Sequence, residues 1–223
     1  ELQGLTDGGQ RIEQLDEELT SLAKQYSSAA GKLSKQRKSA ARKLVKNAAK
    51  VLATLAMEHC QLEIALTALD SEAPHPHGAE EVEYLISTNP GAPTQPLGKI
   101  ASGGELSRIS LAIQVVTASS GTVPSMVFDE VDVGIGGAVA EVVGKLLRDL
   151  SGQAQVLCVT HLPQVAAQGH QHLQVSKVSD KDSVETSLNR LQDEEKVQEI
   201  ARMLGGVKIT KQTLAHAREM LEG

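Results

Sequence analysis

The chain has 223 residues, of which 40% are apolar and 1% aromatic, and its formal net charge is −6. This length allows one medium-sized domain with an aliphatic core, plus an extension. Two tyrosines and one phenylalanine are too few for a protein that grips single strands by stacking bases on rings. The acidic balance also argues against a protein that coats DNA along its whole surface.

The charge is unevenly distributed along the chain. Residues 1–56 hold ten basic and six acidic side chains, whereas the remainder holds twelve and twenty-two. Such asymmetry predicts two regions with different roles. We find no run of 18 apolar residues and no signal-like opening, so we expect no membrane partner. The two cysteines, Cys60 and Cys158, match neither a zinc motif nor a disulfide framework, which fits a reduced cytoplasmic setting. Because the chain opens on Glu1 in mid-pattern, we expect it to be a piece of something longer.

A heptad pattern predicts a long helix at the start of the chain. Apolar residues recur at alternating spacings of three and four, at Ile12, Leu15, Leu19, Leu22, Tyr26, Ala29 and Leu33. The register slips near Gln36 and Lys43 and resumes at Ala48, Leu52, Leu55, His59 and Leu62. The pattern fits an amphipathic helix lying on a domain, or one helix of an antiparallel coiled-coil arm whose partner is missing. We favour the arm and assign it to residues 1–58.

Residues 32–50 of this helix carry basic side chains and no acidic ones. The basic residues are Lys32, Lys35, Arg37, Lys38, Arg42, Lys43, Lys46 and Lys50. A charge run on a helix is usually a solvated face. A stripe of this length also attracts phosphate backbones, so DNA contact is an alternative.

The rest of the chain predicts an α/β fold with a mainly parallel sheet. Period-2 alternation around 62–66 and 82–86, separated by a Pro- and Gly-containing turn at 73–78, predicts two antiparallel strands. Strands and helices then alternate: helix 104–119, strand 125–129, helix 137–150, strand 155–160, helix 162–168, strands 172–177 and 184–190, and two terminal helices. The almost wholly apolar strand 155–160 predicts burial on both faces.

The helix at 104 opens with Ser102, Gly103, Gly104 and Glu105. Glycines let the backbone approach a ligand, and a helix N-terminus offers free N–H groups and a positive dipole end, which together favour a phosphate. The alternative is an ordinary capping box, since Ser102 and Glu105 match S-x-x-E.

Two predicted buried strands end in polar residues. Asp129 and Glu130 follow the strand at 125, and His161 follows the strand at 155. An aspartate in this position is well placed for Mg²⁺, a glutamate can polarise a water molecule, and a histidine can donate a hydrogen bond to phosphate. Acidic turns after strands are common, so the first feature alone is not decisive. We expect the second strand to lie beside the first and to place His161 at the same end of the sheet. This combination favours a nucleotide site.

These motifs, in this order, resemble those of ABC-type ATPases: the signature motif, Walker B with its glutamate, and the switch histidine. The preceding coiled coil narrows the resemblance to the SMC-like ATPases. The stretches "ASGGELSRISLAIQVV", "FDEVDVGIGG", "VTHLPQVAAQGHQH" and "ARMLGG" resemble the RecN family, which acts in DNA double-strand-break repair and recombination. The resemblance covers residues 10–223. It implies a descending coiled-coil arm over 1–58 and the C-terminal lobe of an ABC/SMC-type head over 59–223.

The resemblance also implies roles for individual residues. The signature loop, formed by Ser102, Gly103 and Gly104 and shaped by Glu105, would cap the γ-phosphate of ATP bound to a second protomer. Asp129 would lie near Mg²⁺, Glu130 would act on water, and His161 would sense the γ-phosphate. The family further implies DNA and the recombinase RecA as partners, and a nucleoid-associated location.

One departure concerns the loop after Glu130. Many ABC proteins place an aspartate where this chain has Gly136, within the glycine-rich segment 134–137. Communication between two nucleotide sites is therefore an open question, with Asp132 as the alternative candidate.

A phosphate loop of the form G-x-x-x-x-G-K-[ST] is missing from the sequence. The Gly-Lys pairs at 31, 98 and 144 are followed by Leu or Ile. We therefore expect the complete protein to be an ATPase, this chain alone to be inactive, and an N-terminal RecN-like lobe with Walker A to be a partner. The alternatives are a transport-type ABC fragment and a non-enzymatic coiled-coil scaffold.

Overall fold

The computed structural model describes residues 2–70, 73–100, 102–118, 123–180, 183–206 and 209–222. Its helices are α1 (Leu2–Thr54), α2 (Gly103–Thr117), α3 (Gly137–Leu150), α4 (Pro163–Ala166), α5 (Asp193–Gly205) and α6 (Lys211–Glu222), with a 3-10 turn η1 (Leu97–Lys99). Its strands are β1 (Gln61–Ala68), β2 (Glu80–Ser87), β3 (Gln95–Pro96), β4 (Ser125–Phe128), β5 (Gln155–Cys158), β6 (His172–Asp180) and β7 (Ser183–Leu191).

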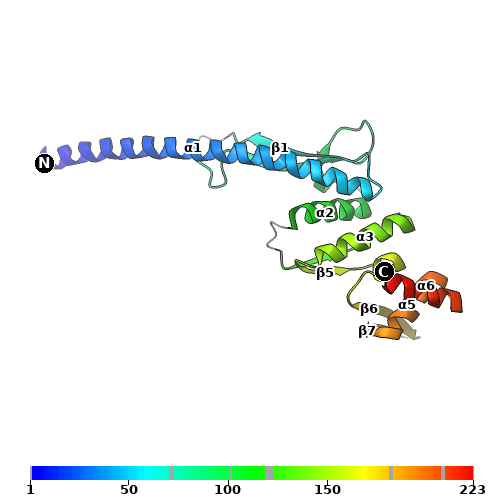
Figure 1. Cartoon of the computed structure of the whole chain (residues 1–223). Helices are drawn as coiled ribbons and strands as arrows, with labels where there is room; N and C mark the ends of the chain where they lie inside the picture. Colours follow the sequence, from blue (N-terminus) through cyan, green and yellow to red (C-terminus); the bar gives the residue numbers. More distant parts are fainter. Residues whose placement is uncertain are drawn as a thin grey trace.

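The predicted N-terminal helix is α1, and its N-terminal half projects far beyond the rest of the molecule (Figure 1). Its two registers differ in burial. The second one turns Ala48, Leu52 and Leu55 into the core, where they are 0–1% exposed. No helix among the described residues is long and apolar enough to cross a membrane.

The period-2 stretches form β1 and β2, which pair antiparallel as predicted. Leu62 lies opposite Ile86, and Ile64 lies opposite Tyr84. The short strand β3 adds to the other side of β2. The sequence patterns did not predict β3, because a two-residue strand leaves no period to detect.

The parallel pair consists of β4 and β5, in register from Ser125↔Gln155 to Phe128↔Cys158. One face, which includes the buried Phe128, packs on the main core formed by the last turns of α1, β1, β2, α2 and α3. The other face is open: Val127, Leu157 and Val159 are 70%, 43% and 60% exposed. The expectation that strand 155–160 is buried on both faces is therefore wrong for this chain by itself.

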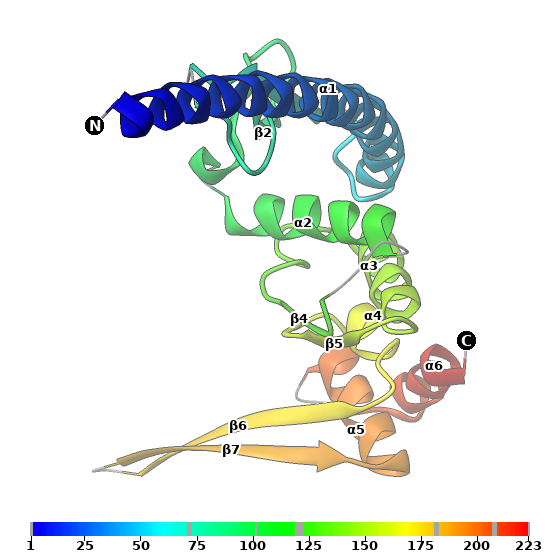
Figure 2. The same ribbon diagram turned by 90° about the vertical axis from the view of Figure 1, so that its left-hand side faces the viewer.

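The last part of the chain forms a long β6–β7 hairpin followed by α5 and α6. Figure 2 shows the hairpin extending along the far side of the molecule from α1. A second, smaller core lies between α5 and α6 and includes Ile200, Ala201 and Ala217. The predicted strands and helices are present with small shifts of their ends. The predicted end of α2 at Ser119 lies outside the described residues.

Candidate nucleotide site

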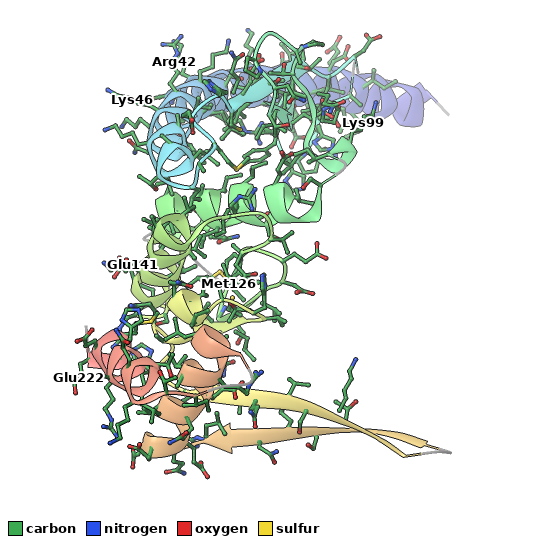
Figure 3. The ribbon with its side chains drawn as sticks, turned by 90° about the vertical axis from the view of Figure 1, so that its right-hand side faces the viewer. Arg42, Lys46, Lys99, Met126, Glu141 and Glu222 are labelled. Carbon is green, nitrogen blue, oxygen red and sulfur yellow. The ribbon has the colours of Figure 1, made fainter. Side chains whose placement is uncertain are left out.

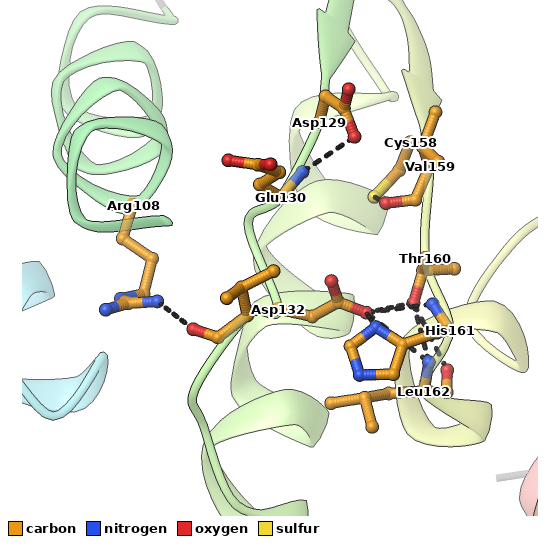
Figure 4. A network of polar contacts seen from close by, with 10 residues as sticks. Arg108, Asp129, Glu130, Asp132, Cys158, Val159, Thr160, His161 and Leu162 are labelled. Carbon is orange, nitrogen blue, oxygen red and sulfur yellow. Dashed lines mark hydrogen bonds and ion pairs between the residues drawn. The ribbon is translucent and has the colours of Figure 1, made fainter. Parts of the chain in front are cut away.

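The site lies where β4 and β5 end. Because the strands are parallel and adjacent, the segments that follow them leave from the same edge of the sheet (Figure 4). The Val159 N–H donates to the Phe128 carbonyl at 2.9 Å, which extends the pairing by one residue. Glu130 and His161 therefore start from neighbouring positions on one edge, as the sequence predicted.

Asp132 joins the two segments. Its carboxylate is 2% exposed, and Oδ2 accepts hydrogen bonds from Thr160 Oγ1 at 2.5 Å, from the His161 N–H at 3.1 Å and from the Leu162 N–H at 3.3 Å. The His161 Nδ1 atom lies 3.4 Å from the same oxygen. Sequence reasoning weighed Asp132 only as a substitute in the glycine-rich loop and missed this central position.

The carboxylates of Asp129 and Glu130 are exposed. Asp129 Oδ1 accepts a hydrogen bond from the Glu130 N–H at 2.9 Å, and Glu130 has a φ of 58°, a conformation that non-glycine residues seldom adopt. Within the described part of the chain, neither carboxylate forms a salt bridge. Both negative charges are therefore available to a cation or to a polar ligand.

The predicted signature loop forms the start of α2. Ser102 is the N-cap, and its Oγ accepts the Glu105 N–H at 3.4 Å, so the capping interpretation is confirmed for this residue. Ser102 is exposed nonetheless. A Cβ atom on Gly103 would collide with Glu130 Oε2, so this carboxylate lies directly over the helix start. The positive end of the α2 dipole favours a negative charge there.

Two hydrogen bonds and one close approach join the start of α2 to the loop that follows β4. Ser107 Oγ donates to the Asp129 carbonyl at 2.6 Å, and Arg108 Nη1 donates to the Val133 carbonyl at 2.8 Å. At Gly104 a Cβ atom would lie 3.2 Å from the Glu130 carbonyl oxygen and 3.3 Å from Val133 atoms. Arg108, which is 8% exposed, was not singled out from the sequence, although a cation inside an apolar-periodic helix is a usable signal.

Burial is the main cause of the pKa shifts near the site. Burial raises the pKa of the Cys158 thiol to about 12, and the charges of Asp132 and Asp129 add to the effect. Burial raises the pKa of Cys60 to about 11, with a contribution from Glu105. Burial lowers the pKa of Arg108, and the Glu105 charge opposes that shift. The Glu105 charge thus contributes to the pKa shifts of both Cys60 and Arg108.

The donor set fits Mg²⁺ held jointly with a nucleotide. No group of three potential metal-ligating side chains occurs among the residues that the structure describes. Mg²⁺ is commonly bound by one or two carboxylates together with phosphate oxygens and water. Asp129, with Glu130 beside it, can supply that number of protein ligands.

Comparisons with known proteins show the family to which the chain belongs. No protein-family model matches it. It is 48% identical to the DNA repair protein RecN of Xylella fastidiosa (strain 9a5c) over 95% of this chain, and 49% identical to that of Vibrio cholerae over 95%. It is 37% identical to the DNA repair protein RecN of Bacillus subtilis (strain 168) over 100% of this chain. The chain belongs to the RecN family. It spans 38% to 41% of the length of these three relatives.

The fold comparison agrees with this assignment to the RecN family. The structure matches the crystal structure of an Smc head domain with a coiled coil and joint derived from Pyrococcus yayanosii, with a TM-score of 0.50 and 21% identity. The match covers 71% of this chain and 28% of that one. At this identity the likeness concerns the fold, which is the ABC/SMC-type head fold expected from the sequence.

Proposed function

We propose that this RecN-family chain forms the C-terminal lobe and descending arm of an ATP-hydrolysing head that acts in DNA double-strand-break repair and recombination. One observation carries the proposal: Glu130 and His161 leave adjacent parallel strands at one edge, and the start of α2 is held against the same loop. The names of its relatives, DNA repair protein RecN, support the biological setting.

The proposed chemistry divides between the two segments at the sheet edge. Glu130 accepts the proton of the water that attacks the γ-phosphate of ATP, and His161 donates a hydrogen bond to a γ-phosphate oxygen. Asp129 holds Mg²⁺, which, when bound, offsets the negative charge of the phosphates.

The signature loop serves the second protomer in this proposal. Backbone N–H groups of Gly103 and Gly104, together with the Ser102 hydroxyl, bind the γ-phosphate of ATP held by the other protomer. ATP binding then joins two heads, and hydrolysis releases them. The exposure of Ser102 leaves the loop accessible to such a partner.

The open sheet face supports a lobe that completes the site. Val127, Leu157 and Val159 expose apolar side chains on one face of β4 and β5, and such a patch is costly in water. The relatives extend well beyond the part matched here. We assign this face to the N-terminal lobe that carries Walker A.

The arm provides the remaining proposed partners. The first heptad register leaves Ile12, Leu15, Leu19 and Leu22 between 47% and 66% exposed, as expected for a helix that pairs with the ascending coil. Figure 3 shows Arg42 and Lys46, two members of the basic stretch, pointing outward from α1, where they can contact DNA phosphates. The proposal also includes RecA as a partner and a nucleoid-associated location in the cytoplasm. It places the boundary between the arm, residues 1–58, and the lobe, residues 59–223.

Phosphate release from ATP tests the proposed function. The 223-residue chain alone should show no turnover above background, whereas its mixture with a RecN-family N-terminal lobe should turn over. In that mixture Glu130→Gln should lower kcat about 100-fold or more, and the matched Glu222→Gln variant at the exposed end of α6 should not. Turnover by the isolated chain that Glu130→Gln removes would contradict the assignment. An inactive mixture would favour the scaffold alternative.

A further inference from the structure

Asp132 is a buried carboxylate to which the proposed ATP chemistry gives no role. It lies on the loop between β4 and α3, and its side chain is 2% exposed. A buried carboxylate is costly unless protein donors replace the water it loses. Here the Thr160 hydroxyl and the N–H groups of residues 161 and 162 supply those donors (Figure 4).

All of these donors belong to one short segment, residues 160–162, which follows β5. They converge on a single oxygen, Asp132 Oδ2. Asp132 therefore fixes the backbone from which the His161 side chain extends, rather than only one neighbouring atom.

The His161 ring lies beside the same oxygen. Nδ1 lies 3.4 Å from Asp132 Oδ2, while 67% of the side chain is exposed. Among the described residues, this ion-pair distance is the one polar contact of the ring. The partner of one imidazole nitrogen decides which nitrogen carries the proton, so an acceptor at Nδ1 favours the Nδ1–H form and leaves Nε2 unprotonated and free.

Asp132 is itself held from the opposite side. The carbonyl of the next residue, Val133, accepts the 2.8 Å hydrogen bond from the buried Arg108 of α2. The 133–134 peptide group is thus bonded to the signature helix, and the Asp132 side chain, one residue earlier, is bonded to the histidine segment. A carboxylate that these bonds keep in place can orient the His161 ring.

We propose that Asp132 is the positioning residue of His161: its Oδ2 holds the 160–162 segment and the Nδ1–H tautomer, and directs Nε2 toward the open edge of the sheet. If a phosphate oxygen binds at that edge, a proton taken from solvent onto Nε2 lets the ring donate to the phosphate while Nδ1–H stays on Asp132. The tautomer and orientation belong to the free chain. The phosphate step rests on the proposed function.

Nitrogen NMR of the 223-residue chain tests the assignment directly. Long-range ¹H–¹⁵N spectra of ¹⁵N-histidine-labelled protein, at a pH where histidines are neutral, distinguish the two tautomers, and His161→Gln identifies the His161 signals. The unsubstituted chain should show His161 mainly as Nδ1–H. Asp132→Asn should shift it toward the Nε2–H form, whereas the matched Asp149→Asn variant, at an exposed position on α3, should not.

Two results would overturn the proposal. One is a His161 that is mainly Nε2–H in the unsubstituted chain, a result that does not depend on how any variant folds. The other is a tautomer that Asp132→Asn leaves unchanged in a chain whose amide spectrum is otherwise preserved.

Kinetics supply a second measurement that separates this proposal from the proposed function. In an active mixture with the N-terminal lobe, Asp132→Asn should lower kcat about tenfold with KM unchanged, as expected for a group that orients another. An unchanged kcat would contradict the positioning role. If no mixture turns over while the tautomer result holds, the ATPase proposal fails and the positioning assignment stands.

Discussion

The two halves of α1 have the same kind of apolar spacing and opposite surroundings. Leu52, near the C-terminal end, is 1% exposed and packs in the main core, whereas Leu19, in the N-terminal half, is 66% exposed. Periodicity thus shows which face of a helix is apolar, but not what covers that face. The same contrast between packed and open settings recurs in a pair of glycines, a pair of glutamates and the two faces of β4 and β5.

The largest expected effect separates the two halves of α1. Leu52→Ala should lower the free energy of unfolding by about 2–5 kcal/mol, because it leaves a cavity in the core. Leu19→Ala should change it by no more than about 0.5 kcal/mol, because the side chain is mostly in water. Urea unfolding followed by circular dichroism measures both. Similar losses for the two variants would mean that the arm is already paired in solution.

Substitution of two glycines by alanine should change the stability in opposite directions. Gly104→Ala should cost about 1–3 kcal/mol, because the new methyl group would meet backbone atoms of the 130–133 loop at 3.2–3.3 Å. Gly31→Ala, in α1 with nothing within 4 Å of its Cβ position, should stabilise the helix by about 0.5–1 kcal/mol. Thermal unfolding of both variants measures the difference. A stabilising Gly104→Ala would show that α2 does not lie against this loop.

Two glutamates that both form ion pairs should differ in how much they contribute to the loss of stability at acidic pH. Glu199, buried in α5, accepts two hydrogen bonds from Arg202 and one from Gln174, and the Arg202 hydrogen bonds lead in lowering its pKa. A carboxyl whose pKa is lower in the folded chain stabilises the fold above its unfolded pKa, about 4.3, and loses that contribution as the pH falls through the folded value. Glu199→Gln should therefore flatten the acid loss of stability.

The control is Glu141, whose exposed pair with Lys145 also lowers its pKa. Water screens this pair, so Glu141→Gln should leave the pH profile nearly unchanged. Urea unfolding at several acidic pH values compares the two variants. Equal flattening by both would contradict the difference in burial.

The smallest effect on stability is expected on the open sheet face. Val127→Lys should change the unfolding free energy of the chain by no more than about 0.5 kcal/mol, since the side chain is already 70% exposed. The same variant should abolish co-elution with the N-terminal lobe in size-exclusion chromatography, because it places a charge in the proposed contact. Unimpaired co-elution would show that the N-terminal lobe binds to another surface.

Local sequence patterns were sufficient for most elements and for the placement of the catalytic candidates. Strict alternation predicted the β1–β2 pairing, and two apolar strands that end in polar residues predicted the shared edge of Glu130 and His161. These features depend on near neighbours and on one general rule about parallel strands.

The remaining features depend on contacts across the fold. The oxygen of Asp132 binds residues 28 to 30 positions away, and Arg108 reaches a carbonyl 25 positions away. The periodicity of apolar residues in the sequence does not predict such long-range hydrogen bonds. The apolar composition of strand 155–160 predicted burial of both faces but not what would cover them. A face covered by another lobe has the same kind of residues as a face covered by the chain itself.

The central claim is that the signature loop of one head and Glu130 of the other head belong to one composite nucleotide site. Sedimentation of the chain mixed with the N-terminal lobe, carrying Glu130→Gln to slow hydrolysis, tests it most directly. Mg²⁺ and ATP should double the mass of the complex, and adding Ser102→Arg should prevent the doubling, because a bulky side chain then blocks the loop. A mass that ATP does not change, or that doubles equally with Ser102→Arg, would contradict the account.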